Sequence, residues 1–135
     1  YKSQDFLAEV LALTDGQGVD VILDPVGGDY LARNVDALRR FGRLVNIGLL
    51  GGTKGELNMG QLLGKRLRLV GSTLRARPVE EKITLTARFD AEVLPKLADD
   101  RLRPIIDTMF PIAEAQAAHE YVAANRNIGK VILEI

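Results

Sequence analysis

Three short segments, rich in glycine or small polar residues, are the places in this sequence where a ligand site is most readily built. They run from Asp24 to Gly28, from Gly48 to Gly52 and from Ser72 to Leu74. Each follows an apolar run typical of a buried strand. Because ligands of a doubly wound parallel sheet bind beyond the carboxyl ends of its strands, we expect these segments to offer backbone N–H groups to a flat polar ligand. Taken singly, each segment is more typical of a tight turn, and the ligand site is indicated only because all three fall at the same edge of the sheet.

No phosphate-binding fingerprint accompanies these segments. Gly16-Gln17-Gly18 begins a Gly-x-Gly pattern, but Val21 stands where a third glycine is required, and a strand follows instead of a helix. The segment from Gly48 to Gly55 lacks the Gly-Lys-Ser/Thr ending of a P-loop. We therefore do not expect a complete dinucleotide site from these residues alone.

The chain contains few residues that are candidates for acid–base catalysis or metal binding. There is no cysteine, and the one histidine, His119, lies beside Glu120 in an alanine-rich helical stretch. The usual zinc ligands are thus missing and a lone helical histidine is a weak candidate for a general base, so we predict neither a metal site nor a catalytic residue. Four basic residues have two interpretations, as a binding site for a phosphate group or as solvent-exposed side chains: Lys65, Arg66, Arg75 and Arg77.

Composition narrows the class of protein. Hydrophobic residues make up 47% and charged residues 27% of the 135, which is typical of a globular domain. The 18 basic residues balance the 18 acidic ones without forming blocks, so neither nucleic acid nor an anionic membrane is expected as a partner. No apolar stretch reaches the roughly 18 residues of a membrane span, and no secretory leader pattern precedes the first helix. These features together favour a cytoplasmic protein.

Alternating elements position the three strand-end segments. The apolar spacing predicts an initial helix capped by Ser3 or Asp5 and ended by the glycines after Asp15. Strands and helices then alternate with short links, which is typical of a right-handed parallel βαβαβ unit and hence of an α/β fold. The predicted strands are 19–24, 43–47 and 67–72, and the helices are 29–42 and a short one around 61–63.

A second set of elements follows from Pro78. We expect a long helix over 78–100 that Pro95 bends or interrupts, with its apolar residues on an inner side: Ile83, Ala87, Leu94 and Leu97. A strand over 105–110, a helix over 113–124 and a strand over 130–135 complete the pattern.

Four runs, at 18–28, 42–48, 72–77 and 124–134, resemble the closing portion of known enzymes. These enzymes are the quinone oxidoreductases related to zeta-crystallin, a zinc-free group of the medium-chain dehydrogenase/reductase superfamily. The likeness is closest to the p53-inducible branch and covers essentially the whole chain. Its most specific part is the terminal run Asn125-Arg126-Asn127-Ile128-Gly129-Lys130-Val131.

The resemblance implies a domain organisation and an activity. Residues 1–103 would form the C-terminal half of a Rossmann NADPH-binding domain, and residues 104–135 would return to a GroES-like substrate domain absent from this sequence. The implied reaction passes a hydride from NADPH to a quinone, and the implied partner is a second copy paired through the strand Leu67–Ser72. Two alternatives stay open: an enoyl reductase acting on acyl thioesters, and a non-catalytic fragment for dimerisation or cofactor binding. The chain does not separate NADP from NAD.

The resemblance also implies which residues contact the cofactor. Tyr1 would contact the adenosine phosphate end and Val26 the ribose region. The nicotinamide would lie near Gly48, Leu49 and Leu50, and its carboxamide near Ser72, Thr73 and Leu74. Asn127 would reach the cofactor from the returning segment.

Overall fold

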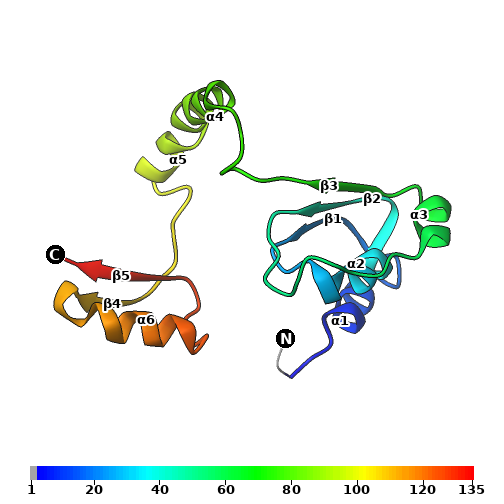
Figure 1. Ribbon diagram of the computed structural model, residues 1–135, viewed down its shortest axis with the longest axis horizontal. Helices are drawn as coiled ribbons and strands as arrows, with labels where there is room; N and C mark the ends of the chain where they lie inside the picture. The colour runs from blue at the N-terminus through cyan, green and yellow to red at the C-terminus, as the bar shows by residue number, and fades with distance from the viewer. Residues whose placement is uncertain (1–2) are drawn as a thin grey trace. The chain divides into compact units, whose positions relative to one another are not determined.

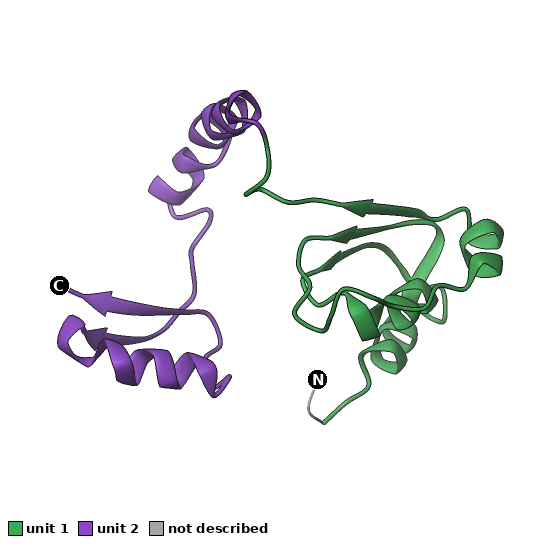
Figure 2. Ribbon diagram, viewed as in Figure 1, with its two compact units in different colours: residues 1–77 green, residues 78–135 purple. Residues whose placement is uncertain are grey.

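The chain folds as two compact units, residues 1–77 and residues 78–135 (Figure 1, Figure 2). The computed structural model describes residues 3–135, and each unit is described below by itself. The sequence predicts a different kind of division, in which residues 1–103 belong to a Rossmann domain and residues 104–135 to a segment that returns to another domain. That assignment stays a prediction.

A three-stranded parallel sheet organises the first unit. Its strands are β1 (Val19–Asp24), β2 (Leu38–Asn46) and β3 (Arg68–Gly71), in the order β1-β2-β3. Leu23, Val45 and Val70 are aligned across the three strands. All three carboxyl ends therefore lie at the same edge, and the predicted parallel α/β unit is confirmed.

Short helices flank this sheet: α1 (Phe6–Leu13), the 3-10 turn η1 (Gly28–Tyr30), α2 (Leu31–Ala37) and α3 (Met59–Lys65). Asp5 caps α1, because its Oδ1 accepts a hydrogen bond from the Leu7 amide at 2.8 Å. The buried core lies between α2 and the sheet and includes Val35, Leu38 and Leu44.

The helix predicted over 29–42 is wrong beyond Ala37. Leu38 is extended and pairs with Val19, so β2 begins where the helix was expected to continue. The Lys65 ammonium donates hydrogen bonds to the carbonyls of Val35, Asp36 and Leu38 at 3.0, 2.9 and 2.8 Å. A residue 27 or more positions away thus satisfies the end of α2. Local periodicity carries no signal for such a cap.

Both outer strands of the sheet leave apolar side chains uncovered within the first unit. Val21 and Leu23 of β1 are 54% and 64% exposed, and Val70 of β3 is 46% exposed. Leu23 and Val70 align with the same residue of β2 and so share one face of the sheet.

The second unit contains a helical segment and a small parallel sheet. Its helices are α4 (Val79–Glu92), α5 (Leu94–Ala98) and α6 (Ala115–Ala123), the last preceded by the 3-10 turn η2 (Ile112–Glu114). The strands β4 (Ile106–Pro111) and β5 (Lys130–Glu134) pair in parallel, and α6 packs on both, with Ala118 buried.

Pro95 interrupts the long helix as predicted, because α4 ends at Glu92 and Pro95 occupies the first turn of α5. The predicted inner side of this helix is not covered within the unit: Ile83, Leu94 and Leu97 are 63%, 44% and 38% exposed. The helical spacing identifies an apolar stripe, but it does not identify what covers the stripe.

Candidate functional site at the carboxyl ends of the strands

Asp24 and Asn46 link the first two strand ends. Asp24 is only 3% exposed, and its Oδ1 accepts hydrogen bonds from the amides of Val26 and Gly27 at 2.7 and 3.0 Å. Asn46 donates from Nδ2 to Asp24 Oδ2 at 3.2 Å and to the carbonyl of Gly48 at 3.0 Å. A buried carboxylate and one side-chain amide therefore fix the starts of both loops.

Backbone hydrogen bonds join the same two loops further along. The amide of Leu50 donates to the Pro25 carbonyl at 3.3 Å, and the amide of Gly51 donates to the Val26 carbonyl at 2.8 Å. Gly28 has φ +44°, and a Cβ built on it would lie 2.3 Å from the Gly51 carbonyl oxygen. The loops approach so closely that Gly28 has no room for a side chain.

The third strand end is attached to the second. The Ser72 amide donates to the Asn46 carbonyl at 2.9 Å. Arg77 reaches back over the turn, donating from Nη2 to Ser72 Oγ at 3.2 Å and from Nε to the Thr73 carbonyl at 3.1 Å. The guanidinium thus fixes the segment 72–77 as it leaves β3.

An open hollow of about 440 Å³ lies at the ends of β2 and β3. Its lining comprises Asn46, Ile47, Gly48, Leu49, Gly71, Ser72 and Thr73. Within residues 3–135, the amide N–H groups of Gly48, Leu49, Thr73 and Leu74 donate to no protein acceptor. A ligand with oxygen acceptors would find donors on both sides of this hollow.

A second hollow of about 320 Å³ adjoins the first, because Asn46, Leu49 and Gly71 line both. Its walls are largely apolar and include Leu44 and Leu69 of the sheet. The paired polar and apolar hollows suit a ligand that has a flat ring and a polar substituent.

The structure brings four of the predicted cofactor residues together in one lining: Gly48, Leu49, Ser72 and Thr73. Val26 lines a separate hollow beside β1. Leu50 and Leu74 lie outside the shared lining, with side chains 88% and 60% exposed. Asn127 belongs to the second unit, and Tyr1 lies outside the described residues. The cofactor roles of all nine stay predictions.

Sequence reasoning missed Asn46 and the part that Arg77 has in shaping the loop. A signal existed for Asn46, because a polar residue inside the apolar run Leu44-Val45-Asn46-Ile47 requires a hydrogen-bond partner. For Arg77 there was none, since its contacts with Ser72 and Thr73 depend on the turn between them.

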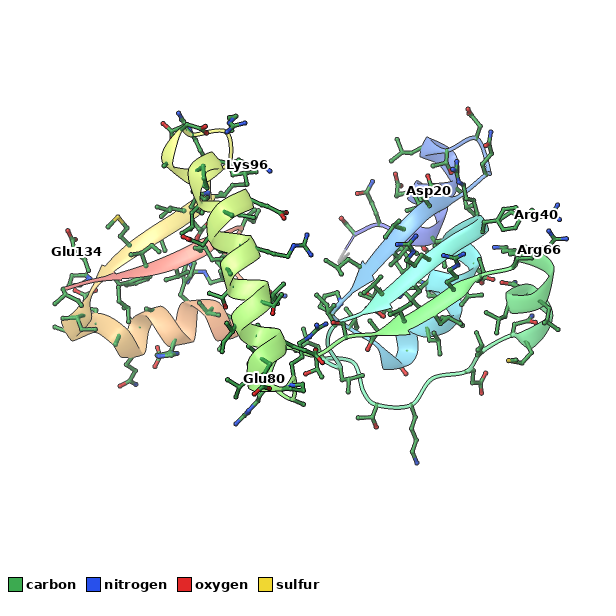
Figure 3. The ribbon with its side chains drawn as sticks, turned by 90° about the horizontal axis from the view of Figure 1, so that it is seen from above. Asp20, Arg40, Arg66, Glu80, Lys96 and Glu134 are labelled. Carbon is green, nitrogen blue, oxygen red and sulfur yellow. The ribbon has the colours of Figure 1, made fainter. Side chains whose placement is uncertain are left out.

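The predicted basic set does not form one cluster. Lys65 and Arg66 precede β3 whereas Arg77 follows it, so they belong to opposite ends of the strand. Lys65 caps α2, and the guanidiniums of Arg66 and Arg40 each lie 5.5 Å from the centre of the Phe41 ring. Figure 3 shows Arg40 and Arg66 at the same end of the first unit.

Metal ligands are not assembled in the part of the chain that the structure describes. No group of three or more His, Cys, Asp or Glu side chains among residues 3–135 could hold a metal ion. None of the helices in that range is both long and apolar enough to span a membrane.

The parallel sheet and its flanking helices give the chain an α/β fold. This fold matches the NAD(P)-binding domain of medium-chain dehydrogenases/reductases. A sequence model of the family described as zinc-binding dehydrogenase matches residues 1–133. The chain belongs to this family. No zinc-ligand set lies within residues 3–135, so we assign no role to zinc in this chain.

Relatives with different functions share this region. The chain is 31% identical to the 2-haloacrylate reductase of Burkholderia sp. over 98% of its length, which is 40% of that protein. It is 30% identical to a protein of Schizosaccharomyces pombe named "Probable quinone oxidoreductase", matching 96% of the chain and 39% of the relative. It is 31% identical over 99% of its length to a highly reducing polyketide synthase of Dothideomycetidae sp., of which it spans 5%.

Solved structures of similar fold include two quinone oxidoreductases. The Pseudomonas syringae enzyme is 26% identical, with a TM-score of 0.69, and the match covers all of this chain and 41% of that one. The Escherichia coli enzyme, complexed with NADPH, has a TM-score of 0.72 at 24% identity over 99% of this chain and 42% of that one. The latter likeness concerns the fold alone.

Proposed function

We propose that this chain is the C-terminal cofactor-binding part of an NADPH-dependent oxidoreductase that reduces a quinone. The reduced nicotinamide supplies a hydride, and the quinone gains this hydride and a proton to become a quinol. The chain's own residues bind and orient the nicotinamide ring. Within residues 3–135 the hollow at the strand ends is lined by backbone, hydroxyl, amide and apolar groups, so in this proposal the proton comes from solvent.

The observation that carries this proposal is the set of unused amide donors at two strand ends. Gly48 and Leu49 offer N–H groups from the loop after β2, and Thr73 and Leu74 offer them from the segment after β3. A nicotinamide carboxamide carries an oxygen acceptor on a flat ring, which fits donors placed beside an apolar wall. NADPH is proposed because the quinone oxidoreductases that the chain resembles are NADPH-dependent; residues 1–135 themselves do not separate NADPH from NADH.

Two relatives bear on the acceptor. The 30% identical protein named as a quinone oxidoreductase supports a quinone, and the 2-haloacrylate reductase supports an activated alkene. The polyketide synthase match favours a second candidate, an enoyl reductase acting on acyl thioesters. Residues outside this chain would distinguish these acceptors, since the chain spans about 40% of the two smaller relatives.

Steady-state assays on the full-length protein test the reaction. We expect NADPH oxidation to be accelerated by 1,4-benzoquinone and not by a crotonyl thioester. If only the thioester is turned over, the quinone reductase proposal is refuted and the enoyl reductase is favoured. An absence of turnover with both acceptors, despite NADPH binding, would leave a non-catalytic cofactor-binding role.

Nuclear magnetic resonance tests the binding site directly. On addition of NADPH, the amide signals of Gly48, Leu49, Thr73 and Leu74 should shift most within the first unit. Gly52, whose amide already donates to the Leu49 carbonyl at 3.1 Å, serves as the internal reference. Uniform small shifts would count against the proposed site.

The edge strand β3 is the proposed surface for a homodimer. Its residues Leu69 and Val70 are 36% and 46% exposed, and an unpaired strand edge favours addition of another strand. Sedimentation of the full-length protein at micromolar concentration should show a dimer. Replacing Leu69 by proline should then yield monomer, because the Ser72 amide donates to β2 and the Leu69 amide, three residues earlier, therefore faces the open edge. A wild-type monomer would refute the surface.

A further inference from the structure

The side chain of Asn46 has one bonded end and one free end. Its Nδ2 donates to Asp24 Oδ2 at 3.2 Å, to the Gly48 carbonyl at 3.0 Å and to the Asp24 carbonyl at 3.4 Å. If the amide were turned over, Oδ1 would face these three oxygens, so the hydrogen bonds fix which end is which. Within residues 3–135, Oδ1 accepts a hydrogen bond from no protein donor.

This free oxygen is open to solvent rather than buried. In the described part of the chain, Gln61 Oε1 is the one completely buried side-chain oxygen or nitrogen that lacks a hydrogen-bond partner. Asn46 is half-buried, and its Oδ1 would share that description if solvent did not reach it. An acceptor that is held in one orientation and is open to solvent is available to a ligand.

The neighbouring strand leaves room for a ligand beside this oxygen. Gly71 of β3 is in register with Asn46 of β2, and positions in register share one face of a sheet. A Cβ built on Gly71 would have no atom within 4 Å. Asn46 and Gly71 line both hollows at the strand ends, of about 440 and 320 Å³. The free acceptor therefore lies where the proposed site would receive the nicotinamide.

A primary carboxamide needs hydrogen-bond partners of both kinds. Its carbonyl oxygen accepts hydrogen bonds, and its NH₂ group donates two. The unused backbone amides at the two strand ends suit the oxygen: Gly48, Leu49, Thr73 and Leu74. An NH₂ group needs an acceptor, and Asn46 Oδ1 is one. A carboxylate in the same place would set one of its oxygens against Asn46 Oδ1, with no hydrogen between them.

We propose that Asn46 is a specificity-determining residue of the cofactor site: its Oδ1 accepts a hydrogen bond from the carboxamide NH₂ of the nicotinamide. Asp24 and Gly48 hold the side chain in the orientation that this contact requires. The site thereby selects a primary amide over a carboxylate or a methyl ketone on the same ring. This assignment rests on the proposed function, and it adds a side-chain acceptor to the backbone donors.

Binding of cofactor analogues to the full-length protein tests the contact without any mutation. The probes are NADP⁺ and its 3-acetylpyridine analogue, which keeps the carbonyl oxygen and replaces NH₂ by a methyl group. Isothermal titration should give a dissociation constant about tenfold higher for the analogue, because the methyl group leaves Asn46 Oδ1 without a partner. The nicotinic acid analogue should also bind at least about tenfold more weakly than NADP⁺. Equal affinities for NADP⁺ and the acetylpyridine analogue would overturn the assignment.

The variant Asn46→Ala separates a direct contact from a structural role. It also removes the hydrogen bonds to Asp24 and Gly48, so the affinities for both dinucleotides should fall. Only a direct contact predicts that the preference for NADP⁺ drops from about tenfold to less than about twofold, since the acceptor for the NH₂ group is gone. A preference retained in Asn46→Ala would overturn the assignment, because another acceptor must then bind the NH₂ group.

Asn58→Ala is the matched control. Asn58 is an exposed asparagine whose Oδ1 accepts a hydrogen bond from the Gln61 amide at 3.1 Å, and it lines neither hollow. This variant should keep the preference of about tenfold for NADP⁺. An equal loss of preference in Asn46→Ala and Asn58→Ala would contradict a direct role of Asn46.

Nuclear magnetic resonance of the unmutated full-length protein keeps the test decisive even if Asn46→Ala does not fold. The side-chain carbonyl carbon of Asn46 should shift on addition of NADP⁺ and should change little on addition of the acetylpyridine analogue. Equal shifts with both dinucleotides would refute the contact while leaving the proposed function intact. If neither dinucleotide binds, the proposed function is refuted, and this assignment with it.

Discussion

Asn46 donates its side-chain hydrogen bond to Asp24 Oδ2 at 3.2 Å, from the end of one strand to the end of its neighbour. The same amide also donates to the Gly48 carbonyl, so one side chain serves two loops. Since Asp24 accepts further bonds from Val26 and Gly27, the starts of the loops after β1 and β2 depend on the buried carboxylate. The pair holds the two loops together beneath the proposed site, and Asn46 also lines both of its hollows.

Loss of the Asp24 carboxylate should therefore destabilise the protein. Asp24→Ala leaves buried amide donors without acceptors, and we expect the free energy of unfolding to fall by about 3 kcal/mol. Asp29 is an exposed aspartate five residues after the end of β1, and Asp29→Ala is the matched control, which should change the free energy of unfolding by less than about 0.5 kcal/mol. Urea-induced unfolding measures both. Equal effects would show that Asp24 does not fix the loops.

The close approach of Gly28 to Gly51 gives a steric prediction. Gly28→Ala places a Cβ 2.3 Å from the Gly51 carbonyl oxygen at a positive φ, so the free energy of unfolding should fall by more than about 2 kcal/mol. Gly64 lies in α3 with no atom within 4 Å of a built Cβ. Gly64→Ala should instead be neutral or stabilise by up to about 1 kcal/mol. Thermal unfolding of the two variants compares them, and the same sign for both would contradict this account.

The ammonium of Lys65 gives a prediction about α2. Lys65→Met keeps the aliphatic chain but removes the donor for three carbonyls, and we expect a loss of about 1–2 kcal/mol in the free energy of unfolding. Lys54→Met on the exposed loop is the control and should have little effect. Hydrogen exchange should also accelerate in α2. Unaltered exchange there would mean that the cap does not hold the helix end.

The alternation of strands and helices was predictable because buried parallel strands leave continuous apolar runs, as in Val19–Asp24. The break at Pro95 was predictable because proline lacks an amide donor. The boundary at Leu38 was not, since Leu38 fits both the inner stripe of a helix and the start of a strand. Its pairing with Val19 and the cap from Lys65 decide between the two.

The candidate site was predictable only in outline. Strand-end position alone placed Gly48, Leu49, Ser72 and Thr73 at one edge. The bonds that shape this edge come from Asn46 and Arg77, which depend on how loops of different strands meet. Leu50 shows the limit of this prediction, because its amide is already engaged by the Pro25 carbonyl although the amides of Gly48 and Leu49 before it donate to no protein acceptor within residues 3–135.

Tyr121 gives a prediction about pH. The hydrogen bond to Asp107, assisted by desolvation and the nearby negative charge, raises the pKa of the Tyr121 hydroxyl above its ordinary value. A raised folded pKa means that the contribution of this contact to stability is present below the ordinary value of about 10 and is lost as the pH rises through the folded pKa. Titration of the Tyr121 ring carbon signal should show this shift. In Asp107→Asn the pKa should move back toward the ordinary value, and a pKa unaffected by that change would refute the stated cause.

The affinity of the 135 residues for NADPH follows from what their loops offer. The unused amides of Gly48, Leu49, Thr73 and Leu74 suit a nicotinamide, but the glycine-rich phosphate fingerprint is absent from the sequence. Charge-assisted hydrogen bonds to a pyrophosphate at a helix N-terminus normally supply much of the binding free energy. A polypeptide of residues 1–135 should therefore bind NADPH no more tightly than about 1 mM, or about −4 kcal/mol, against about 1 μM or −8 kcal/mol for the full-length protein. Isothermal titration of both measures the difference. A micromolar dissociation constant at one site per chain for residues 1–135 would show that these residues hold a complete cofactor site without that fingerprint.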